Sequence, residues 1–375
     1  MSRADSITPF LQEAVREGVF PGAVLFVRSH GEVVYHHAVG HMGHPPYDCP
    51  VLTETIYDLA SLTKPLATTT AILCLLQDGQ LDLDQPVQEW ISEWESTSYQ
   101  ATTIRQLLHH SSGLPAWRPY YKTLSPAGLS PKNGNERQER IQGLVRTIAG
   151  EALEYEPDNH SVYSDLGFIV LGVVIERCVG SSLAEYCRNR IYESLNSNPL
   201  FFIDTEGHPA GGDGDLTHVA PTEHDPWRGR LVQADVHDEN AYALGGIAGH
   251  AGLFGTALSV SQVSGAWLQA VLGRSSRLPP DLAQQFVRRQ DSSGTSSWAL
   301  GWDTPSQPSS SGRHFSPESF GHLGYAGTSL WIDPVRELEV ILLSNRVHPT
   351  RANKQIKDFR PKLHDLVVEE LGKES

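Results

Sequence analysis

Cysteine is scarce in this chain of 375 residues, which contains Cys49, Cys74, Cys178 and Cys187 and no Cys-x-x-Cys pair. Such sparse cysteines argue against a disulfide framework and suit reduced thiols that pack as small apolar side chains. Cys178 and Cys187 flank an expected helix-turn-helix at residues 180–182. A single bridge between these two residues therefore stays open as an alternative.

Basic residues are also few, with 29 Lys and Arg against 44 Asp and Glu, a net charge of −15. No long basic run offsets this charge, which repels nucleic acid and anionic lipid surfaces. No apolar run is long enough to span a bilayer. We therefore expect a small molecule or a peptide as the partner, with no nucleic acid and no membrane insertion.

The sequence as given also shows no pattern of an export signal. Residues 1–10 contain no basic segment followed by an apolar stretch. We therefore expect a cytoplasmic protein, or a periplasmic or extracellular one if a leader has been removed. The sequence does not indicate the oligomeric state.

The pattern of apolar residues predicts one sheet built from both ends of the chain. Residues 23–27 and 33–35 form the strands of a hairpin with a turn at 29–31. Strand-like runs return at 328–332 and 338–343. Because hairpin neighbours pair antiparallel, we expect an antiparallel sheet.

Helical patterns surround and separate these strands. A helix is predicted from Thr8 to Gly18, and a last helix runs to Leu371, although Pro361 should kink or break it. Further helical patterns occupy residues 62–78, 137–149, 165–178 and 183–191. The middle of the chain should therefore form a mainly helical lobe with long loops.

These elements together predict an α/β (α+β) fold, in which helices flank an antiparallel sheet and a mainly helical domain is inserted. The sheet domain would comprise residues 1–60 and 245–375, and the helical domain residues 61–244. With 39% hydrophobic residues, a chain of this length buries enough apolar surface for both.

Ser61 and Lys64 form the only Ser-x-x-Lys pair in the chain, directly before an apolar helical run that ends near Gly79. A serine hydroxyl becomes a nucleophile when a neighbouring base takes its proton, and residues three apart share a helix face. Burial and the start of the helix should lower the pKa of Lys64 toward the range of a base. A chain of this composition contains about one such pair by chance, so other elements must support it.

Two later elements give this support: Tyr163-Ser164-Asp165 before an apolar helix, and Gly321-His322-Leu323-Gly324 before a strand. In this order the three elements resemble those of the serine β-lactamase and penicillin-binding protein superfamily. The segment Leu107–Leu114 is similar to one in the class C branch. The segments at 236–254 and 344–349 resemble penicillin-binding protein 4B-like carboxypeptidases and N-acetylmuramoyl-L-alanine amidases.

The resemblance implies a β-lactamase/transpeptidase-like fold and a serine hydrolase that works through an acyl-enzyme without metal or cofactor. Ser61 would be the nucleophile, and Lys64 and Tyr163 would accept its proton. The Tyr163 phenol would share or lose its own proton beside Lys64. The backbone N–H groups of Ser61 and Tyr325 would form the oxyanion hole. The implied substrate is an amide or ester, such as a cell-wall-derived muramoyl peptide or a small ester.

Two positions depart from the family pattern. Asp165 stands where the class C pattern has Asn, and a carboxylate donates no hydrogen bond, so we expect Asp165 to hold Lys64 or to fix the loop rather than to polarise the substrate. His322 stands where Lys is usual, and histidine is mostly neutral at neutral pH, so it should hold a substrate carboxylate weakly. Gly324 would let the backbone approach the substrate.

The departures leave alternatives open. A D-Ala-D-Ala carboxypeptidase or a β-lactamase is one alternative within the same chemistry. A non-catalytic penicillin-binding sensor, which is acylated and not released, is an alternative of a different class.

Several other residues are candidates for substrate binding. Arg346 and Arg351 follow the last strand and could bind a carboxylate, although solvated arginines are an equal alternative. His237 and Asp238 should line the mouth of the cleft or brace a loop, with His250 structural. These residues show no fixed metal-binding spacing, so we expect no metal.

Overall fold

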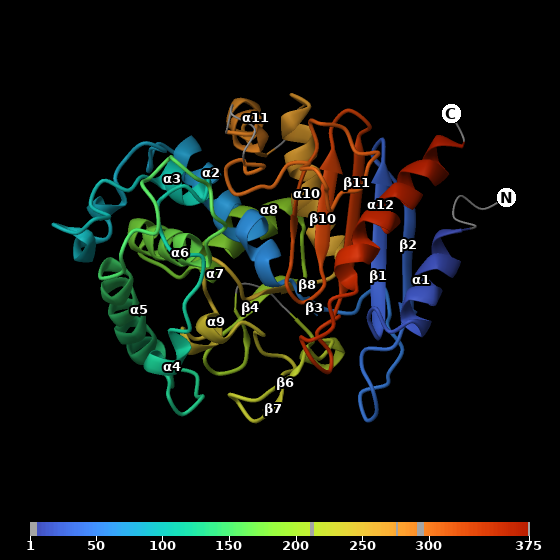
Figure 1. Ribbon diagram of the computed structural model, residues 1–375, viewed down its shortest axis with the longest axis horizontal. Coiled ribbons are helices and arrows are strands. Elements are labelled where there is room, and N and C mark those ends of the chain that lie inside the picture. The colour runs from blue at the N-terminus through green and yellow to red at the C-terminus, as the bar shows by residue number, and fades with distance from the viewer. Residues whose placement is uncertain (1–5, 211–213, 275–276, 291–295, 374–375) are drawn as a thin grey trace.

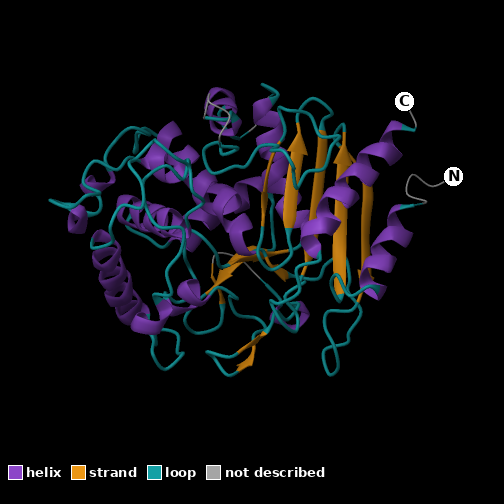
Figure 2. Ribbon diagram, in the orientation of Figure 1, coloured by secondary structure: helices purple, strands orange, loops and turns teal. Residues whose placement is uncertain are grey.

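The computed structural model describes residues 6–210, 214–274, 277–290 and 296–373. A five-stranded antiparallel sheet forms one half of the molecule, in the order β2-β1-β11-β10-β9 (Figures 1 and 2). Its strands are β1 (Gly22–Ser29), β2 (Glu32–Gly40), β9 (Phe320–Leu323), β10 (Ser329–Asp333) and β11 (Leu338–Ser344). The prediction of one antiparallel sheet from both ends of the chain is therefore confirmed.

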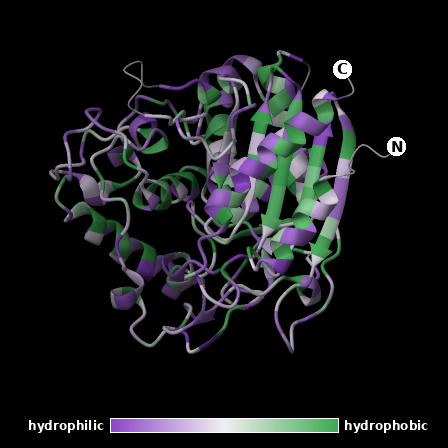
Figure 3. Cartoon of the chain, turned by 45° about the vertical axis from the view of Figure 1, so that its right-hand side comes forward, coloured by the Kyte–Doolittle hydropathy of each residue, from purple (hydrophilic) through white to green (hydrophobic). Residues whose placement is uncertain are grey.

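The central strands are buried on both faces, and the two faces belong to two different cores. Successive side chains of a strand point to opposite faces. Val24 and Phe26 of β1 therefore join the large core, whereas Leu25 and Val27 join the second one. Figure 3 shows the resulting hydrophobic strands.

Helices cover both faces of this sheet (Figure 1). Side chains of α1 (Ile7–Arg16) and α12 (Ile356–Gly372) pack in the second core, and those of α10 (Ala257–Val271) in the large one. The helix α11 (Pro280–Val287) packs beside α10 through Phe286 and Trp267. The first and last helices thus lie together on one side of the sheet.

The C-terminal part differs from the sequence-based description at Pro361, where the helix is not broken, and at β9. Pro361 does not break α12, because it lies in the second turn, where its missing N–H removes one hydrogen bond while Phe359 and Leu363 remain packed on the sheet. The strand β9 was not predicted, because it has four residues and contains Gly321. Strands this short carry too little alternation to be recognised.

The helical half of the chain contains the predicted helices with small shifts in their ends. A long buried helix, α6, lies at its centre and packs on α3 (Figure 1). The helices are α2 (Thr70–Gln77), α3 (Ile104–Leu108), α4 (Tyr121–Leu124), α5 (Gly134–Ala149), α6 (Asp165–Val179), α7 (Leu183–Cys187), α8 (Glu193–Leu195) and α9 (Glu239–Ala243). The boundaries proposed for two domains stay a prediction.

The helix predicted at 62–78 is not a regular α-helix throughout. It begins with a 3₁₀ turn (Ala60–Leu62), continues as a π-helix (Lys64–Thr69) and becomes α-helical in α2. The helix expected at 183–191 changes in the same way to a π-helix at Arg188–Tyr192. Hydrophobic periodicity does not distinguish these close variants, and π segments in proteins are frequent at functional sites.

Small strands and turns connect the two halves. A second sheet has the order β3-β8-β4-β5, and β6 pairs with β7. These strands are β3 (Tyr57–Asp58), β4 (Leu200–Ile203), β5 (Pro209–Ala210), β6 (His224–Asp225), β7 (Arg230–Leu231) and β8 (Leu253–Gly255). Further 3₁₀ turns lie at Val87–Glu89, Ser92–Trp94 and Leu216–His218.

Cys178 and Cys187 are free thiols, so the alternative of a bridge between them is wrong. In the part of the chain that the structure describes, no single helix has the length and apolar composition to cross a membrane. Asp165–Val179 and Leu183–Leu195 meet that test only as a pair bent by 74°.

Two helical glycines allow a test of how closely α6 packs on the loop that follows α9. A Cβ on Gly172 would lie 2.8 Å from the backbone nitrogen of Gly249, whereas a Cβ on Gly143 in α5 would meet nothing within 4 Å. Gly143→Ala should raise the free energy of unfolding by about 0.5–1 kcal/mol, because alanine favours helix. Gly172→Ala should lower it by about 1–3 kcal/mol, because the new methyl group overpacks the contact. Urea denaturation of both variants checks this, and equal stabilisation by both would contradict it.

Candidate active site

A cavity of about 670 Å³ lies between the helical half and the edge of the main sheet. Ser61, Tyr163 and Asp165 line it from one side, and His322 and Tyr325 line it from the end of β9 and the turn that follows. The remaining predicted site residues on its wall are His237, Asp238, Gly324, Arg346 and Arg351. The structure therefore brings together residues that are up to 290 positions apart in the chain.

Ser61 is held in position by a strained turn. Ala60, directly before it, has a φ of 48°, a value that non-glycine residues rarely adopt. The Asp58 carboxylate stabilises this turn, since Oδ1 accepts a hydrogen bond of 2.7 Å from the Ala60 N–H. Its other oxygen accepts a hydrogen bond of 2.7 Å from the His237 N–H. One buried carboxylate thus joins the Ser61 turn to the loop before α9.

The Ser61 hydroxyl accepts two hydrogen bonds. Lys64 Nζ lies 3.0 Å from Ser61 Oγ, and the Tyr163 hydroxyl lies 2.9 Å from the same atom. The predicted Ser-Lys-Tyr group is therefore in hydrogen-bonding contact, as a serine activated by a lysine–tyrosine pair requires.

Lys64 is fully buried and is an ammonium group surrounded by acceptors. Its Nζ lies 2.7 Å from Asp165 Oδ1 and 3.1 Å from the His250 carbonyl oxygen, and 4.8 Å from the centre of the Tyr163 ring. Burial alone would lower the pKa of Lys64, but the Asp165 carboxylate and Tyr163 outweigh it, and the pKa is raised. The expectation of a lowered Lys64 pKa is therefore wrong, because it did not include the Asp165 charge.

Tyr163 keeps its proton in the resting site. Burial raises the pKa of Tyr163 to about 12, although the Lys64 charge acts in the opposite direction. The ring packs between His110 and Trp298, with centroids 4.9 and 5.3 Å away. The phenol donates its hydrogen to a hydrogen bond with Ser61 and does not lose it. Of the two forms considered from the sequence, the deprotonated phenol is therefore wrong.

Asp165 begins α6, and Ser164 caps the helix by accepting a hydrogen bond from the Gly167 N–H. The carboxylate faces Lys64 and also reaches the cavity wall. The structure thus places Asp165 where it was expected, as the residue that holds Lys64.

His322 is buried and neutral. Burial and the nearby Lys64 charge lower the pKa of His322 to about 3, and Nδ1 lies 2.9 Å from the Leu323 carbonyl oxygen. The imidazole therefore offers no positive charge to a substrate, in agreement with the sequence-based expectation.

Gly324 and Tyr325 lie in the turn between β9 and β10. A Cβ on Gly324 would lie 1.9 Å from Thr328 Oγ1 and 2.7 Å from the Leu59 carbonyl oxygen. Position 324 therefore requires glycine because a larger side chain would collide with Thr328 and Leu59. The sequence had suggested a different reason, the close approach of the substrate. Thr328 Oγ1 donates to Leu59 O at 3.0 Å, so this turn is fastened beside the Ser61 turn. The Tyr325 ring is 50% exposed and forms part of the cavity wall.

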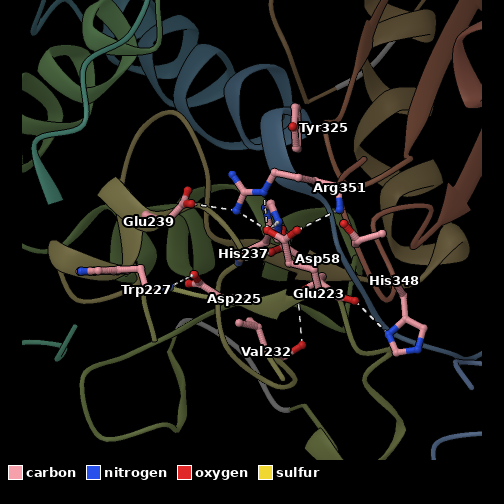
Figure 4. A network of polar contacts seen from close by, with 12 residues as sticks. Asp58, Glu223, Asp225, Trp227, Val232, His237, Glu239, Tyr325, His348 and Arg351 are labelled. Atoms are coloured by element: carbon pink, nitrogen blue, oxygen red, sulfur yellow. Dashed lines mark hydrogen bonds and ion pairs between the residues drawn. The ribbon is translucent and has the colours of Figure 1, made fainter. Parts of the chain in front are cut away.

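His237 and Glu239 brace the cavity wall through polar contacts with Glu223 and Arg351 (Figure 4). His237 Nε2 lies 2.9 Å from Glu223 Oε1, and Arg351 Nη2 lies 2.8 Å from Glu239 Oε1 and also contacts Glu223. Arg351 is therefore neutralised within the protein and has no free charge for a substrate.

Asp238 caps α9 and binds His250. Its Oδ1 accepts a hydrogen bond from the Ala241 N–H and lies 2.8 Å from His250 Nε2. His237 and Asp238 thus serve both expected purposes, since they line the cavity and brace its loop. No group of three or more His, Cys, Asp or Glu residues suited to a metal ion occurs among the described residues.

Several cavity residues were not found from the sequence. Trp298 packs against both Tyr163 and His322, and Trp117, Asp303 and Arg360 also line the cavity. The position of Asp58, two residues before Ala60, was the available sequence signal for a side chain that braces the Ser61 turn. The others lie in loops or a helix face without any local pattern.

The chain is similar to a known family and to several known proteins. The family model described as Beta-lactamase matches residues 7–362. A protein of Escherichia coli O157:H7, named as a candidate D-alanyl-D-alanine carboxypeptidase, is 29% identical over 388 residues, which cover 95% of this chain and 85% of that protein.

Two solved structures show the shared fold. EstCE1, described as a hydrolase with promiscuous acyltransferase activity, has a TM-score of 0.72 and 22% identity over 96% of this chain and 98% of its own. The octameric penicillin-binding protein homologue from Pyrococcus abyssi has a TM-score of 0.72 and 23% identity over 98% of this chain and 77% of its own. The predicted β-lactamase/transpeptidase-like fold is therefore confirmed.

The Asp165–Lys64 contact predicts how the reactivity of Ser61 depends on pH. Because the pKa of Lys64 is raised, the pair that accepts the serine proton becomes a base only as the pH rises. Asp165→Asn removes the charge that raises this pKa, so the rise in reactivity should move to lower pH by about one to three units. The rate at which a fluorophosphonate labels Ser61, measured against pH, checks this.

Asp303→Asn is the matched control, because Asp303 lines the same cavity but contacts Ser297 and Thr304 and does not contact Lys64. The labelling rate of Asp303→Asn should rise over the same pH range as that of the wild type. An unshifted Asp165→Asn profile, or equal shifts in both variants, would contradict the role of Asp165.

Proposed function

The chain belongs to the β-lactamase family of serine hydrolases, and on this premise we propose that it cleaves amides or esters through an acyl-enzyme on Ser61. The observation that carries the proposal is the pair of hydrogen bonds that Ser61 Oγ accepts, from Lys64 at 3.0 Å and from Tyr163 at 2.9 Å. A hydroxyl in this position has a proton acceptor within reach as soon as the pair loses one proton.

The reaction would proceed in two steps. Ser61 Oγ attacks the substrate carbonyl carbon while its proton passes to the Lys64–Tyr163 pair, and the backbone N–H groups of Ser61 and Tyr325 stabilise the oxyanion. Tyr163 then returns a proton to the leaving nitrogen or oxygen as the bond to it breaks. Water releases the acyl group by the same relay in reverse.

We propose a cell-wall-derived peptide, such as a muramoyl peptide, or a small ester as the substrate. The cavity supports this range, because about 670 Å³ accommodates an extended dipeptide or an aryl ester and it is lined by Trp117, Tyr163 and Trp298. A D-Ala-D-Ala carboxypeptidase is the second candidate, favoured by the name of the Escherichia coli relative.

Ser61→Ala tests the mechanism. The variant should lose turnover of every substrate that the wild type hydrolyses, by about 10³-fold or more, because its nucleophile is absent. Ser182→Ala, which removes the hydroxyl that caps α7, is the control and should keep full turnover. Activity is measured on p-nitrophenyl esters, nitrocefin, D-Ala-D-Ala peptides and muramoyl peptides.

The same measurement separates the alternatives. Retained turnover in Ser61→Ala would overturn the mechanism. Faster turnover of nitrocefin or D-Ala-D-Ala peptides than of muramoyl peptides and neutral esters would overturn the substrate assignment. A persistent penicillin adduct in mass spectrometry, with no turnover of any substrate, would identify a sensor.

A further inference from the structure

Two separate turns carry the N–H groups that are proposed for the oxyanion hole. The Ser61 N–H lies in the turn that follows β3, and the Tyr325 N–H lies in the turn between β9 and β10. Both donors stabilise one oxyanion only when each is about 2.7–3.1 Å from the same oxygen position. The relative position of the two turns therefore decides whether the hole is complete.

One hydrogen bond joins the two turns directly. Thr328 Oγ1 donates to the Leu59 carbonyl oxygen at 3.0 Å, and both residues are buried. A single hydrogen bond fixes one distance but still allows one turn to rotate against the other. A second contact between the turns is needed to fix the orientation of the two donors.

His237 contacts both turns. Its backbone N–H donates to Asp58 Oδ2 at 2.7 Å, and Asp58 Oδ1 accepts from the Ala60 N–H at 2.7 Å. Its imidazole ring is stacked on the Tyr325 ring, with the ring centres 5.8 Å apart and the planes 24° from parallel. One residue thus reaches the Ser61 turn through its main chain and the Tyr325 turn through its side chain.

Glu223 fixes the direction of the imidazole ring. His237 Nε2 lies 2.9 Å from Glu223 Oε1, and the Arg351 N–H donates to Glu223 Oε2 at 2.9 Å (Figure 4). Burial would raise the pKa of Glu223, but the hydrogen bonds from His237 and Arg351 lower it to about 2, so the carboxylate is charged at neutral pH. Since His237 is itself buried, this charge-assisted contact holds the ring against Tyr325.

Contacts within the Tyr325 turn serve a different purpose. Arg360 Nη2 donates at 2.9 Å to Gly324 O, which belongs to the peptide group that carries the Tyr325 N–H. Arg346 Nε donates to Tyr325 O at 3.0 Å. These bonds fix the peptide groups of the turn itself, whereas the contact with His237 fixes the turn relative to the nucleophile.

We propose that His237 is a positioning residue that sets the orientation of the Tyr325 N–H relative to the Ser61 N–H, so that both point at one oxyanion. The proposal rests on the proposed function and deepens it. Because His237 also lines the cavity, it could instead contact the substrate directly. The two roles differ in one respect: a positioning role depends on the oxygen that becomes the oxyanion, and a direct contact does not.

The test compares 4-nitrophenyl benzoate with its thionoester, in which sulfur replaces the carbonyl oxygen. The two esters have nearly the same shape, but sulfur is a weak hydrogen-bond acceptor, so the thionoester gains little from the oxyanion hole. The kcat/KM of the ester divided by that of the thionoester, relative to the same ratio for hydrolysis by hydroxide, should be at least about a hundredfold in the wild type.

His237→Ala should lower this ratio by about tenfold or more, mainly through the kcat/KM of the ester. His237→Phe keeps a ring against Tyr325 but loses the bond to Glu223, so it should keep part of the ratio. Tyr325→Leu removes the other ring of the stack and leaves the backbone N–H in place. It should lower the ratio as His237→Ala does, and the double variant should fall no further.

His348→Asn is the matched control. His348 is also a buried histidine of this network, but its side chain bonds to the Thr222 carbonyl oxygen at 2.9 Å and to the His44 N–H at 3.1 Å, and to neither turn (Figure 4). Its ratio should change less than about twofold, even if the variant is less stable.

A ratio that stays at the wild-type value in His237→Ala, whatever the loss of activity, or an equal fall in His348→Asn would overturn the positioning role. If His237→Ala fails to fold, Tyr325→Leu decides, because that ring is 50% exposed, and an unchanged ratio would again overturn the role. A wild-type ratio near one would overturn the oxyanion hole together with the role of His237. Ester turnover that persists in Ser61→Ala would instead overturn the proposed function.

Discussion

The buried Lys64 ammonium is the group on which the arrangement of the site depends. A charge removed from water must be compensated by the protein, and here Asp165 and the His250 carbonyl oxygen provide the compensation at 2.7 and 3.1 Å. These acceptors come from the start of α6 and from the loop before β8. The cost of an unpaired lysine therefore fixes two distant segments relative to Ser61.

Backbone contacts make this arrangement possible. The loop that carries the His250 carbonyl group can approach α6 because Gly249 and Gly172 face each other, where a Cβ on Gly249 would lie 2.1 Å from Phe168 O. Thr68 also donates to Gly249 O at 2.6 Å, which joins the loop to the π-helix after Lys64. The irregular helix, the paired glycines and the buried charge thus belong to one structural unit.

The sequence was informative where chemistry is local and less so where it depends on packing. Ser61 and Lys64 are three residues apart, so a helix was enough to place them together. The Lys64 pKa was misjudged because Asp165, 101 residues away, decides its sign. Arg360 gave no local signal, because a single arginine in an amphipathic helix resembles any solvated one. Its burial and lack of an acidic partner are properties of the folded chain.

The neutral side chain at position 322 limits the electrostatic repulsion around Lys64. A lysine at position 322 would bring a second cation close to Lys64, since the Lys64 charge already lowers the pKa of His322. A neutral His322 avoids this repulsion and leaves the raised pKa of Lys64 to be set by Asp165. The positive charge instead resides on Arg346 and Arg360, which are held by carbonyl oxygens of the turn at 324–328. The Lys64 side chain is fully buried and does not line the cavity, whereas both arginines do.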